Sequence, residues 1–377
     1  MRKVYLDNAA TTPVSDEVIE SMVKNLKQTF GNPSSSHHFG REAKGQLEEA
    51  RRKIATAIHA KPSQICFTSC GTESNNSVLK NAFQSLQIER ILVSPIEHPS
   101  IHATIKEVAQ DIEIVYLPID KFGSILTDSL EKLLSEGNKK TLVSVMHANN
   151  EVGALNDIET ICKISKKYNA FVHSDMVQTM GHLPLNMEAL GIDFVAASAH
   201  KFHGPKGVGF LYIKNPNCLK PFISGGSQER GMRSGTENMA SIIGMSVALE
   251  HAVKNIADDE AYVNNLRKSM AEKLGNTILD IEIITNLENS LYTVLTIGFP
   301  EIMSNDMLTF QLDMKGIACS SGSACSSGAN KGSHVLEALN YPKERKAIRF
   351  SFSKFNKMDE IEYAVEKIVE LYTETVK

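Results

Sequence analysis

The feature that most constrains the fold is an alternation of short apolar runs with helical patterns between about residues 40 and 250. Seven runs of four to seven residues have the composition of strands, at residues 65–68, 90–94, 113–117, 141–147, 170–174, 194–198 and 208–213. Residues 42–58 and 157–168 place apolar side chains at helical spacing between such runs. We therefore predict an α/β fold with a mainly parallel, seven-stranded sheet and crossover helices.

The pattern changes after residue 260. Helices are predicted over 259–274, near 305–314 and at the carboxyl end, and a strand is predicted over 291–299. The last helix places Ile361, Ala364, Ile368 and Leu371 on one face, which suits the cover of a small sheet. Because single cores stop growing near ~250 residues, we expect a large domain of residues 14–258 and a smaller α+β domain of residues 1–13 with 259–377.

Charge and cysteine content narrow the class of protein. The 40 basic and 44 acidic residues are interspersed, so neither a nucleic acid nor a membrane is an expected partner. No stretch reaches the ~18 apolar residues of a membrane span, and the amino terminus turns polar at Asp7, too early for a secretory signal. Six cysteines without paired C-x-x-C spacing indicate a reducing compartment, and we expect a cytoplasmic protein.

Polar clusters follow the predicted strands, where open α/β sheets bind ligands. Asp175 and Gln178 follow one strand, and Ser198, His200 and Lys201 follow the next. An acid and a lysine so placed could approach pyridoxal phosphate from opposite sides, because this cofactor needs a lysine amine for its Schiff base and a carboxylate at its pyridine nitrogen. A plain surface salt bridge is the alternative, and on these two residues alone it is favoured.

Three further sites, one of them a pair of neighbouring residues, have two interpretations each. Gly71 and Thr72 open a helix whose free N–H groups could hold a phosphate, or they are ordinary helix-start residues. His98 could stack on a planar ring or move a proton, or it is a hydrogen-bonded loop histidine. Asn149 has the same placement and also suits a turn.

The later part of the chain adds similar candidates. Residues 233–239 suit a phosphate contact or a capped helix. Cys325 lies among small polar residues, where a thiolate could reach a partner, in a Ser- and Gly-rich loop of about residues 319–333 that we expect to be mobile. Cys319 and Cys162 are expected to be packing residues. Arg349, which alternates with apolar residues, could emerge from a strand edge and clamp a carboxylate or line a solvent face.

Ten motifs together resemble the cysteine desulfurases of the class-V aminotransferase family. In chain order they are YLDNAATTP, GNPSSSHHFG, FTSCGTESNN, EHPS, NNEVG, DMVQ, SAHKFHGPKG, RSGTEN, SSGSAC and IRFSFSKF. The likeness covers nearly the whole chain and implies the fold of type I pyridoxal-phosphate transferases. The SSGSAC form resembles group I, the NifS/IscS-like enzymes, whose cysteine loop delivers sulfur to a scaffold or carrier protein.

The resemblance implies a set of residues that bind the cofactor. They are Gly71, Thr72, His98, Asn149, Asp175, Gln178, Ser198, His200, Lys201 and Thr236. Among them Lys201 would form the Schiff base, Asp175 would pair with the pyridine nitrogen, Gln178 would contact the ring hydroxyl, and His98 would stack on the ring and shuttle protons. Thr236 would reach the phosphate of a neighbouring subunit, which implies a homodimer.

The resemblance also implies the reaction. Asn149 and Arg349 would hold the substrate carboxylate, and Cys325, Lys201 and His98 would be catalytic. L-cysteine would give L-alanine and a Cys325 persulfide, which passes to an iron–sulfur scaffold or a sulfur carrier for cluster assembly or thiolation. No resident metal is expected, although Cys325 is a candidate transient ligand of an iron–sulfur cluster.

A free thiol with a pKa of ~8.5 is only slightly ionised at neutrality, so a nearby base such as His98 is expected to matter. Selenocysteine lyase, another class-V enzyme such as a transaminase, and a non-catalytic scaffold are the alternatives.

Overall fold

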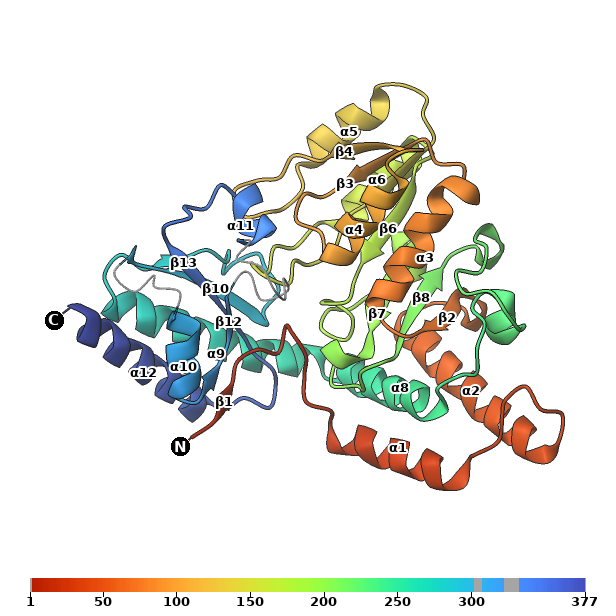
Figure 1. The fold of residues 1–377 in the computed structure, drawn as a ribbon, viewed down its shortest axis with the longest axis horizontal. Helices are drawn as coiled ribbons and strands as arrows, with labels where there is room; N and C mark the ends of the chain where they lie inside the picture. The colour runs from red at the N-terminus through yellow and green to blue at the C-terminus, as the bar shows by residue number, and fades with distance from the viewer. Residues whose placement is uncertain (1, 302–306, 322–331, 377) are drawn as a thin grey trace.

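The seven predicted strand runs form one sheet in the large lobe of the protein (Figure 1). The computed structural model describes residues 2–301, 307–321 and 332–376. The strands lie in the order β2-β8-β7-β6-β5-β3-β4. Their bounds are β2 (Ile65–Thr68), β3 (Arg90–Val93), β4 (Glu113–Tyr116), β5 (Thr141–Ser144), β6 (Phe171–Asp175), β7 (Phe194–Ser198) and β8 (Gly209–Ile213). The predicted α/β class and seven-stranded sheet are therefore confirmed.

One strand departs from the parallel arrangement. β8 runs antiparallel to both of its neighbours, β2 and β7, while the other neighbouring pairs are parallel. The connection from β7 to β8 comprises residues 199–208, which is shorter than the dozen or more residues of a usual crossover. The short connection thus accounts for the reversed direction, and it carries Lys201.

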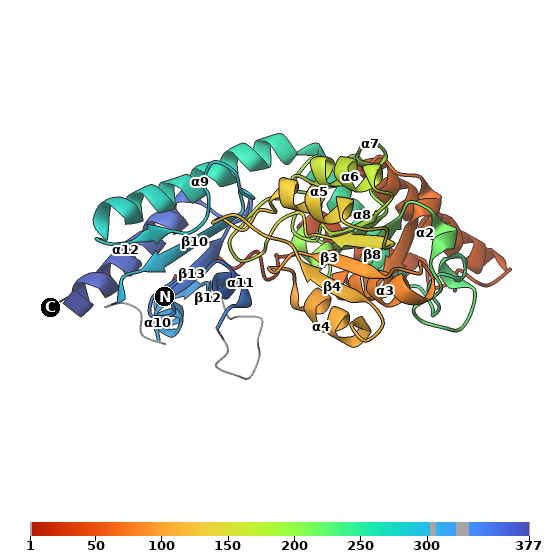
Figure 2. The ribbon, with the colours of Figure 1, turned by 90° about the horizontal axis from the view of Figure 1, so that it is seen from above.

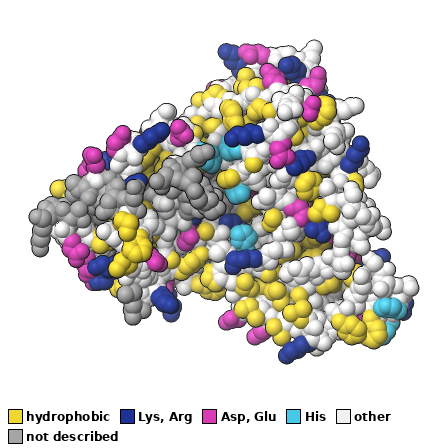
Figure 3. Space-filling view, in the orientation of Figure 1, with side chains coloured by type: hydrophobic (Ala, Val, Ile, Leu, Met, Phe, Trp, Pro, Cys, Tyr) yellow, Lys and Arg dark blue, Asp and Glu magenta, His cyan; other side chains and the backbone are white. Residues whose placement is uncertain are grey.

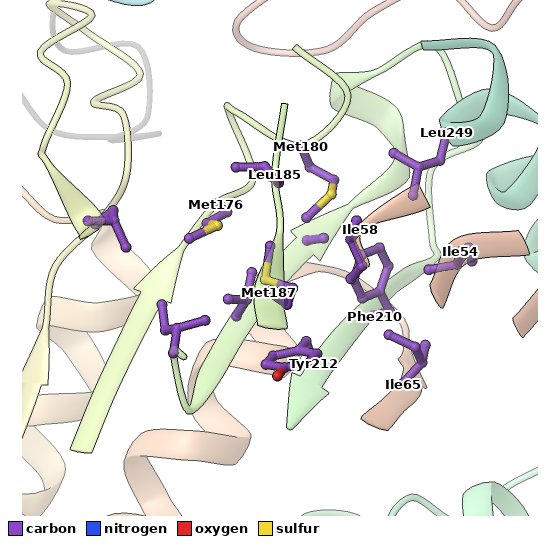
Figure 4. Close-up of a cluster of buried hydrophobic side chains, with 14 of the residues drawn as sticks. Ile54, Ile58, Ile65, Met176, Met180, Leu185, Met187, Phe210, Tyr212 and Leu249 are labelled. Atoms are coloured by element: carbon purple, nitrogen blue, oxygen red, sulfur yellow. The ribbon is translucent and has the colours of Figure 1, made fainter. Parts of the chain in front are cut away.

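Helices cover both faces of this sheet. α3 (Gly71–Gln84) and α4 (Pro99–Val108) pack on one face, with Leu211 and Ile213 of β8 in the same cluster. The other face is covered by α1 (Asp16–Gln28), α2 (His38–Ala57), α5 (Thr127–Ser135), α6 (Ile158–Lys167) and α8 (Met239–Lys254). Phe210 and Tyr212 belong to that second cluster (Figure 4), as expected from the alternation of side chains along a strand. Cys162 is also buried in it, so its predicted packing role is confirmed.

The small lobe has its own sheet, in the order β12-β13-β10-β9. Its strands are β9 (Glu282–Ile283), β10 (Val294–Phe299), β12 (Ser320–Ser321) and β13 (Lys346–Ser351), and a separate pair joins β1 (Val4–Tyr5) to β11 (Ile317–Ala318). The helices are α9 (Ile256–Thr277), α10 (Leu308–Met314), α11 (His334–Ala338) and α12 (Met358–Val376). Seen from above, α9 and α12 lie along one face of this sheet (Figure 2).

The predicted final helix is confirmed, because Ile361, Ala364 and Ile368 of α12 are fully buried in the core of the small lobe. α9 runs across the predicted domain boundary at residue 258, and the division into residues 14–258 and the remainder stays a prediction. None of the helices in the described part of the chain is long and apolar enough to span a membrane.

Candidate active site

A cavity of about 280 Å³ lies where the sheet of the large lobe meets the small lobe. Its lining residues are Ala9, Ala10, Cys70, Gly71, Thr72, His98, Met146, Asn150, Asp175, Val177, Gln178, Ser198, His200, Lys201 and Arg349. Nine of the predicted site residues are among them. Histidine side chains gather along the junction of the lobes on the face shown in Figure 3. The structure thus brings together residues from distant motifs at the carboxyl ends of strands, as expected for this class of sheet.

Lys201 lies in the short turn after β7, opposite the amino-terminal segment. Its Nζ donates to the carbonyl oxygens of Ala9 at 2.6 Å and Ala10 at 2.8 Å. The Thr12 N–H donates to the carbonyl of His200, and Thr11 Oγ1 lies 3.1 Å from His200 Nδ1. The YLDNAATTP motif therefore holds the lysine through its main chain, a function that the side chains of the two alanines do not reveal.

Asp175 ends β6 and lies in the wall of the cavity. Its carboxylate is nearly buried and accepts hydrogen bonds from Asn75 Nδ2 at 2.7 Å and from the Val177 N–H at 3.0 Å. Neutral donors of this kind stabilise the ionised carboxylate. The alternative of a plain surface salt bridge with Lys201 is wrong, because Asp175 is not on the surface.

His98 caps the start of α4 and lines the same cavity. The Ser100 N–H donates to His98 Nδ1 at 3.1 Å, and Ser100 Oγ lies 2.8 Å from the same nitrogen. Burial lowers the pKa of His98, and the nearby Lys201 and His334 add to this shift, while the charge of Asp175 opposes it. The imidazole is consequently neutral near pH 7.

The start of α3 forms a cradle for an anion. Gly71 and Thr72 are its first residues, so their N–H groups precede the first helical hydrogen bonds and face the cavity wall. A Cβ at Gly71 would lie only 2.6 Å from Val177 Cγ2, so this position admits glycine alone without rearrangement. Ser198 and His200 lie beside it, and burial lowers the pKa of His200 to about 4. A phosphate-bearing cofactor with an aldehyde for Lys201 and a basic ring nitrogen for Asp175 fits this set of groups.

Arg349 belongs to the inner strand β13, which pairs with β10 and β12. The prediction that it emerges from a strand edge is wrong, because β13 has a neighbour on each side and the side chain is buried. Its Nη2 binds Asp7 Oδ1 at 2.7 Å and its Nη1 donates to the Asn150 carbonyl at 2.9 Å. Its buried Nε has no hydrogen-bond partner within the described residues. Nη1 and Nη2 each keep a second hydrogen, and a guanidinium that lines the cavity suits a carboxylate.

Two predicted residues lie elsewhere. Asn149 is fully buried and does not line the cavity; its Nδ2 donates to the Ile96 carbonyl and its Oδ1 accepts from the N–H groups of Glu151 and Val152. Its neighbour Asn150 lines the cavity instead.

Thr236 lines a separate cavity of about 240 Å³, together with Thr68 and Arg233. In the same motif Arg233 pairs with Glu73 at 2.9 Å, and Asn238 caps α8 by accepting from the Ser241 N–H. The capped-helix interpretation of residues 233–239 is confirmed, and a phosphate contact there stays a prediction.

Cys325, the predicted nucleophile, lies outside the described residues. On the near side of that segment, Ser320 Oγ donates to Asp7 Oδ1 at 2.8 Å, so β12 contacts the carboxylate that holds Arg349. On the far side, Ser333 Oγ donates to Glu151 Oε2 at 2.5 Å. Cys319 packs against the small-lobe core and burial raises its pKa to about 12, which confirms its packing role.

Sequence reasoning missed three polar residues beside the cavity: Asn75, Glu97 and Ser100. Glu97 is buried, its Oε1 accepts from the Met146 N–H at 2.6 Å, and its Oε2 has no partner within the described residues. Burial and the charge of Asp175 raise the pKa of Glu97 well above its ordinary value. Asn75 belongs to the FTSCGTESNN motif, and Glu97 and Ser100 belong to the EHPS motif, so membership of a motif was the signal that could have found them.

Comparison with known proteins gives consistent matches over the whole length. The family model described as "Aminotransferase class-V" matches residues 4–364. A cysteine desulfurase IscS from Dictyoglomus turgidum is 42% identical over 98% of this chain and 95% of its own length. Among solved structures, a NifS-like protein has a TM-score of 0.92 at 39% identity and covers 99% of this chain and 100% of its own. A structure of SspA in complex with cysteine has a TM-score of 0.80 at 30% identity, covering 94% and 100%.

Proposed function

The chain belongs to the cysteine desulfurases of the class-V aminotransferase family, and from this premise we propose that it uses pyridoxal phosphate to take sulfur from L-cysteine, releasing L-alanine. The observation that carries the proposal is one cavity that holds the Lys201 amine, the buried Asp175 carboxylate, the His98 ring and the start of α3. The structural relative in complex with cysteine supports this choice of substrate.

Each wall of the cavity suits one part of the cofactor. The N–H groups of Gly71 and Thr72, with Ser198 and His200, bind the phosphate. When bound, the cofactor supplies an electron-poor ring that accepts electrons released at the substrate α-carbon. The Asp175 carboxylate, oriented by hydrogen bonds from Asn75 and the Val177 N–H, would pair with the ring nitrogen of the cofactor.

The substrate is oriented from the small lobe. Arg349 binds the substrate carboxylate through donors that Asp7 and the Asn150 carbonyl leave available, and these two partners keep the guanidinium from rotating. Lys201 then moves the proton at the substrate α-carbon, from a position fixed by the Ala9 and Ala10 carbonyls. Predicted carboxylate contacts of Asn149 are carried instead by its neighbour Asn150 and by Arg349, since Asn149 is buried and does not line the cavity.

Cys325 receives the sulfur. Its thiolate forms a sulfur–sulfur bond as the carbon–sulfur bond of the substrate breaks, so that cysteine and the Cys325 thiol together become alanine and a Cys325 persulfide. Iron–sulfur scaffold or sulfur-carrier proteins then accept that sulfur in the cytoplasm. Thr236, exposed and outside the main cavity, contacts the phosphate of the neighbouring subunit in a homodimer.

The test is to supply pyridoxal phosphate, record the absorption spectrum, and measure sulfide and alanine after adding L-cysteine with a reductant. We expect a cofactor band and equal amounts of both products. Lys201→Ala should lose both turnover and the absorption band of the cofactor bound covalently to the lysine. Cys325→Ser should keep that band and lose sulfide release. Cys218→Ser, remote from the cavity, is the matched control and should behave as the unaltered protein.

A cofactor band without these products would favour a selenocysteine lyase or a transaminase instead. Assays with selenocysteine and with keto acids as substrates would distinguish these two activities. Persistent sulfide release by Cys325→Ser would exclude Cys325 as the sulfur acceptor.

A further inference from the structure

Two residues outside the predicted site link Asp175 to His98. Asn75 Nδ2 lies 2.7 Å from Asp175 Oδ2 and 3.1 Å from Ser100 Oγ, and Ser100 Oγ lies 2.8 Å from His98 Nδ1. Asn75 and Ser100 are both buried, on α3 and α4 respectively. We propose that Asn75 and Ser100 are positioning residues that hold His98 in the tautomer with its hydrogen on Nε2, so that His98 is a hydrogen-bond donor in the cavity and not a base.

The direction of each hydrogen bond follows from the groups themselves. The Asn75 atom that faces Asp175 is the amide nitrogen, which donates to the carboxylate oxygen. That nitrogen carries two hydrogens, and the second points to Ser100 Oγ. Ser100 Oγ accepts from Asn75 and keeps its own hydrogen, which it can donate to His98 Nδ1 when that nitrogen carries no hydrogen.

The main chain gives the same answer independently. The Ser100 N–H can only donate, and it points to His98 Nδ1 at 3.1 Å. A nitrogen that accepts from a main-chain N–H carries no hydrogen, so the single hydrogen of the neutral ring is on Nε2. Two donors converge on Nδ1, and Nε2 is the ring nitrogen left for a ligand in the cavity that His98 lines.

Burial and two of the three charged or titratable groups around His98 keep the ring neutral. Lys201 and His334 oppose a positive charge on the ring, as does burial, while Asp175 alone favours it. Protonation at Nδ1 would also place two hydrogens against each other, one from the ring and one from the Ser100 N–H.

This inference rests on the proposed function for its chemical meaning. In this tautomer His98 cannot take the proton of the Cys325 thiol through Nε2, which differs from the role expected from the sequence. It donates a hydrogen bond to an acceptor in the cavity, such as the sulfur or a carboxylate oxygen of the substrate, and a neutral imidazole can polarise a reacting group in this way. The base that ionises Cys325 is then another group.

The direct test is nitrogen NMR of the full chain labelled with ¹⁵N-histidine, with and without pyridoxal phosphate, using His98→Gln to assign the signal. We expect Nδ1 at the shift of an unprotonated nitrogen and Nε2 at that of a protonated one, with no titration midpoint between about pH 7 and about pH 9. A hydrogen on Nδ1, or titration within this range, overturns the proposal. The tautomer is read from the unaltered protein and needs no turnover, and the variant serves only to assign the signal, so the result is independent of the proposed function.

The role of Ser100 has its own test. Ser100→Ala should move the Nδ1 signal and lower kcat with cysteine by about tenfold, part of the ~10²–10⁴ that a positioned proton donor contributes, with KM changed less than about twofold. Ser100→Thr keeps a hydroxyl and should restore both values. Ser77→Ala removes a buried hydroxyl whose one partner among the described residues is the Glu73 carbonyl on α3, and should change neither. A Ser100→Ala protein with an unchanged signal and unchanged kcat would show that Ser100 does not position His98.

Discussion

Arg51 and Arg349 are both buried and both bind a carboxylate, but they differ in how many of their N–H groups have hydrogen-bond partners within the protein. Arg51 binds the two oxygens of Glu229 at 2.6 and 2.8 Å, a Glu48 oxygen at 3.1 Å and the Ile65 carbonyl at 2.9 Å. Its guanidinium also lies over a phenylalanine ring, 4.5 Å from the ring centre. Every nitrogen of Arg51 therefore has a partner inside the protein.

Arg349 has fewer partners. It contacts one oxygen of Asp7 and the carbonyl of Asn150, and its Nε is buried without a partner in the described part of the chain. Glu97 Oε2 and Asn75 Oδ1 beside the cavity share this property. Because buried polar groups in proteins are nearly always hydrogen-bonded, complete bonding marks Arg51 as structural, whereas Arg349 lines the cavity and has guanidinium hydrogens to spare for a ligand.

Glu229→Gln gives the largest effect expected from this comparison. It leaves the buried Arg51 charge without its carboxylate, and breaking such a pair costs about 3–5 kcal/mol. Urea denaturation followed by circular dichroism should show that loss. Glu131→Gln, in the exposed pair with Lys167, is the matched control and should cost less than about 1 kcal/mol. Equal losses in the two variants would contradict a structural role for the Arg51 pair.

Arg349→Lys should affect binding more than stability. Lysine keeps the charge but loses the forked donors, so one or two charge-assisted hydrogen bonds to the substrate carboxylate are lost, about 10- to 100-fold in KM for cysteine. Arg51→Lys should show the reverse pattern, with lower stability and an unchanged KM. Alanine formation at varied cysteine concentration measures KM. If Arg349→Lys leaves KM unchanged, the substrate carboxylate is bound elsewhere.

The sequence predicted the large sheet and most of the cavity for one physical reason. Strands that are buried on both faces have continuous apolar runs. The polar residue that follows each run must therefore lie at the carboxyl end of its strand. Asp175, Ser198 and Lys201 were placed in this way without knowledge of tertiary contacts.

Contacts set by tertiary packing were not predictable in this manner. Asp7 and Arg349 are 342 residues apart in the chain, so the strand pattern around Arg349 did not show that β13 is an inner strand. In the NNEVG turn, hydrogen bonds to the N–H groups of residues 151 and 152 hold Asn149 inward and leave Asn150 at the cavity, a difference that composition does not reveal.

Glu97→Gln tests a buried carboxyl group that, unlike Glu229, has no arginine partner among the described residues, and it is expected to have the smallest effect. The raised pKa of Glu97 means that the folded protein keeps its proton at pH values where the unfolded chain, with a carboxyl pKa of ~4.3, has released it. Unfolding then releases a proton, so Glu97 lowers the free energy of unfolding as pH rises above ~4.3, by at most ~1.4 kcal/mol per pH unit, up to the raised pKa. Glutamine cannot ionise and can still accept from the Met146 N–H, so this part of the pH dependence should disappear.

Urea midpoints at about pH 5 and about pH 8 test this, because the stability of Glu97→Gln relative to the unaltered protein should rise between them. The exposed Glu131→Gln variant again serves as the control. Glu229→Gln removes a carboxylate that binds the Arg51 guanidinium through both oxygens, whereas Glu97→Gln replaces a carboxyl group that keeps its proton in the folded protein. The two substitutions should therefore change stability in opposite directions at pH 8. An equal pH dependence with and without Glu97 would show that its carboxyl is ionised in the folded protein, and the incomplete bonding of Oε2 would then need a different explanation.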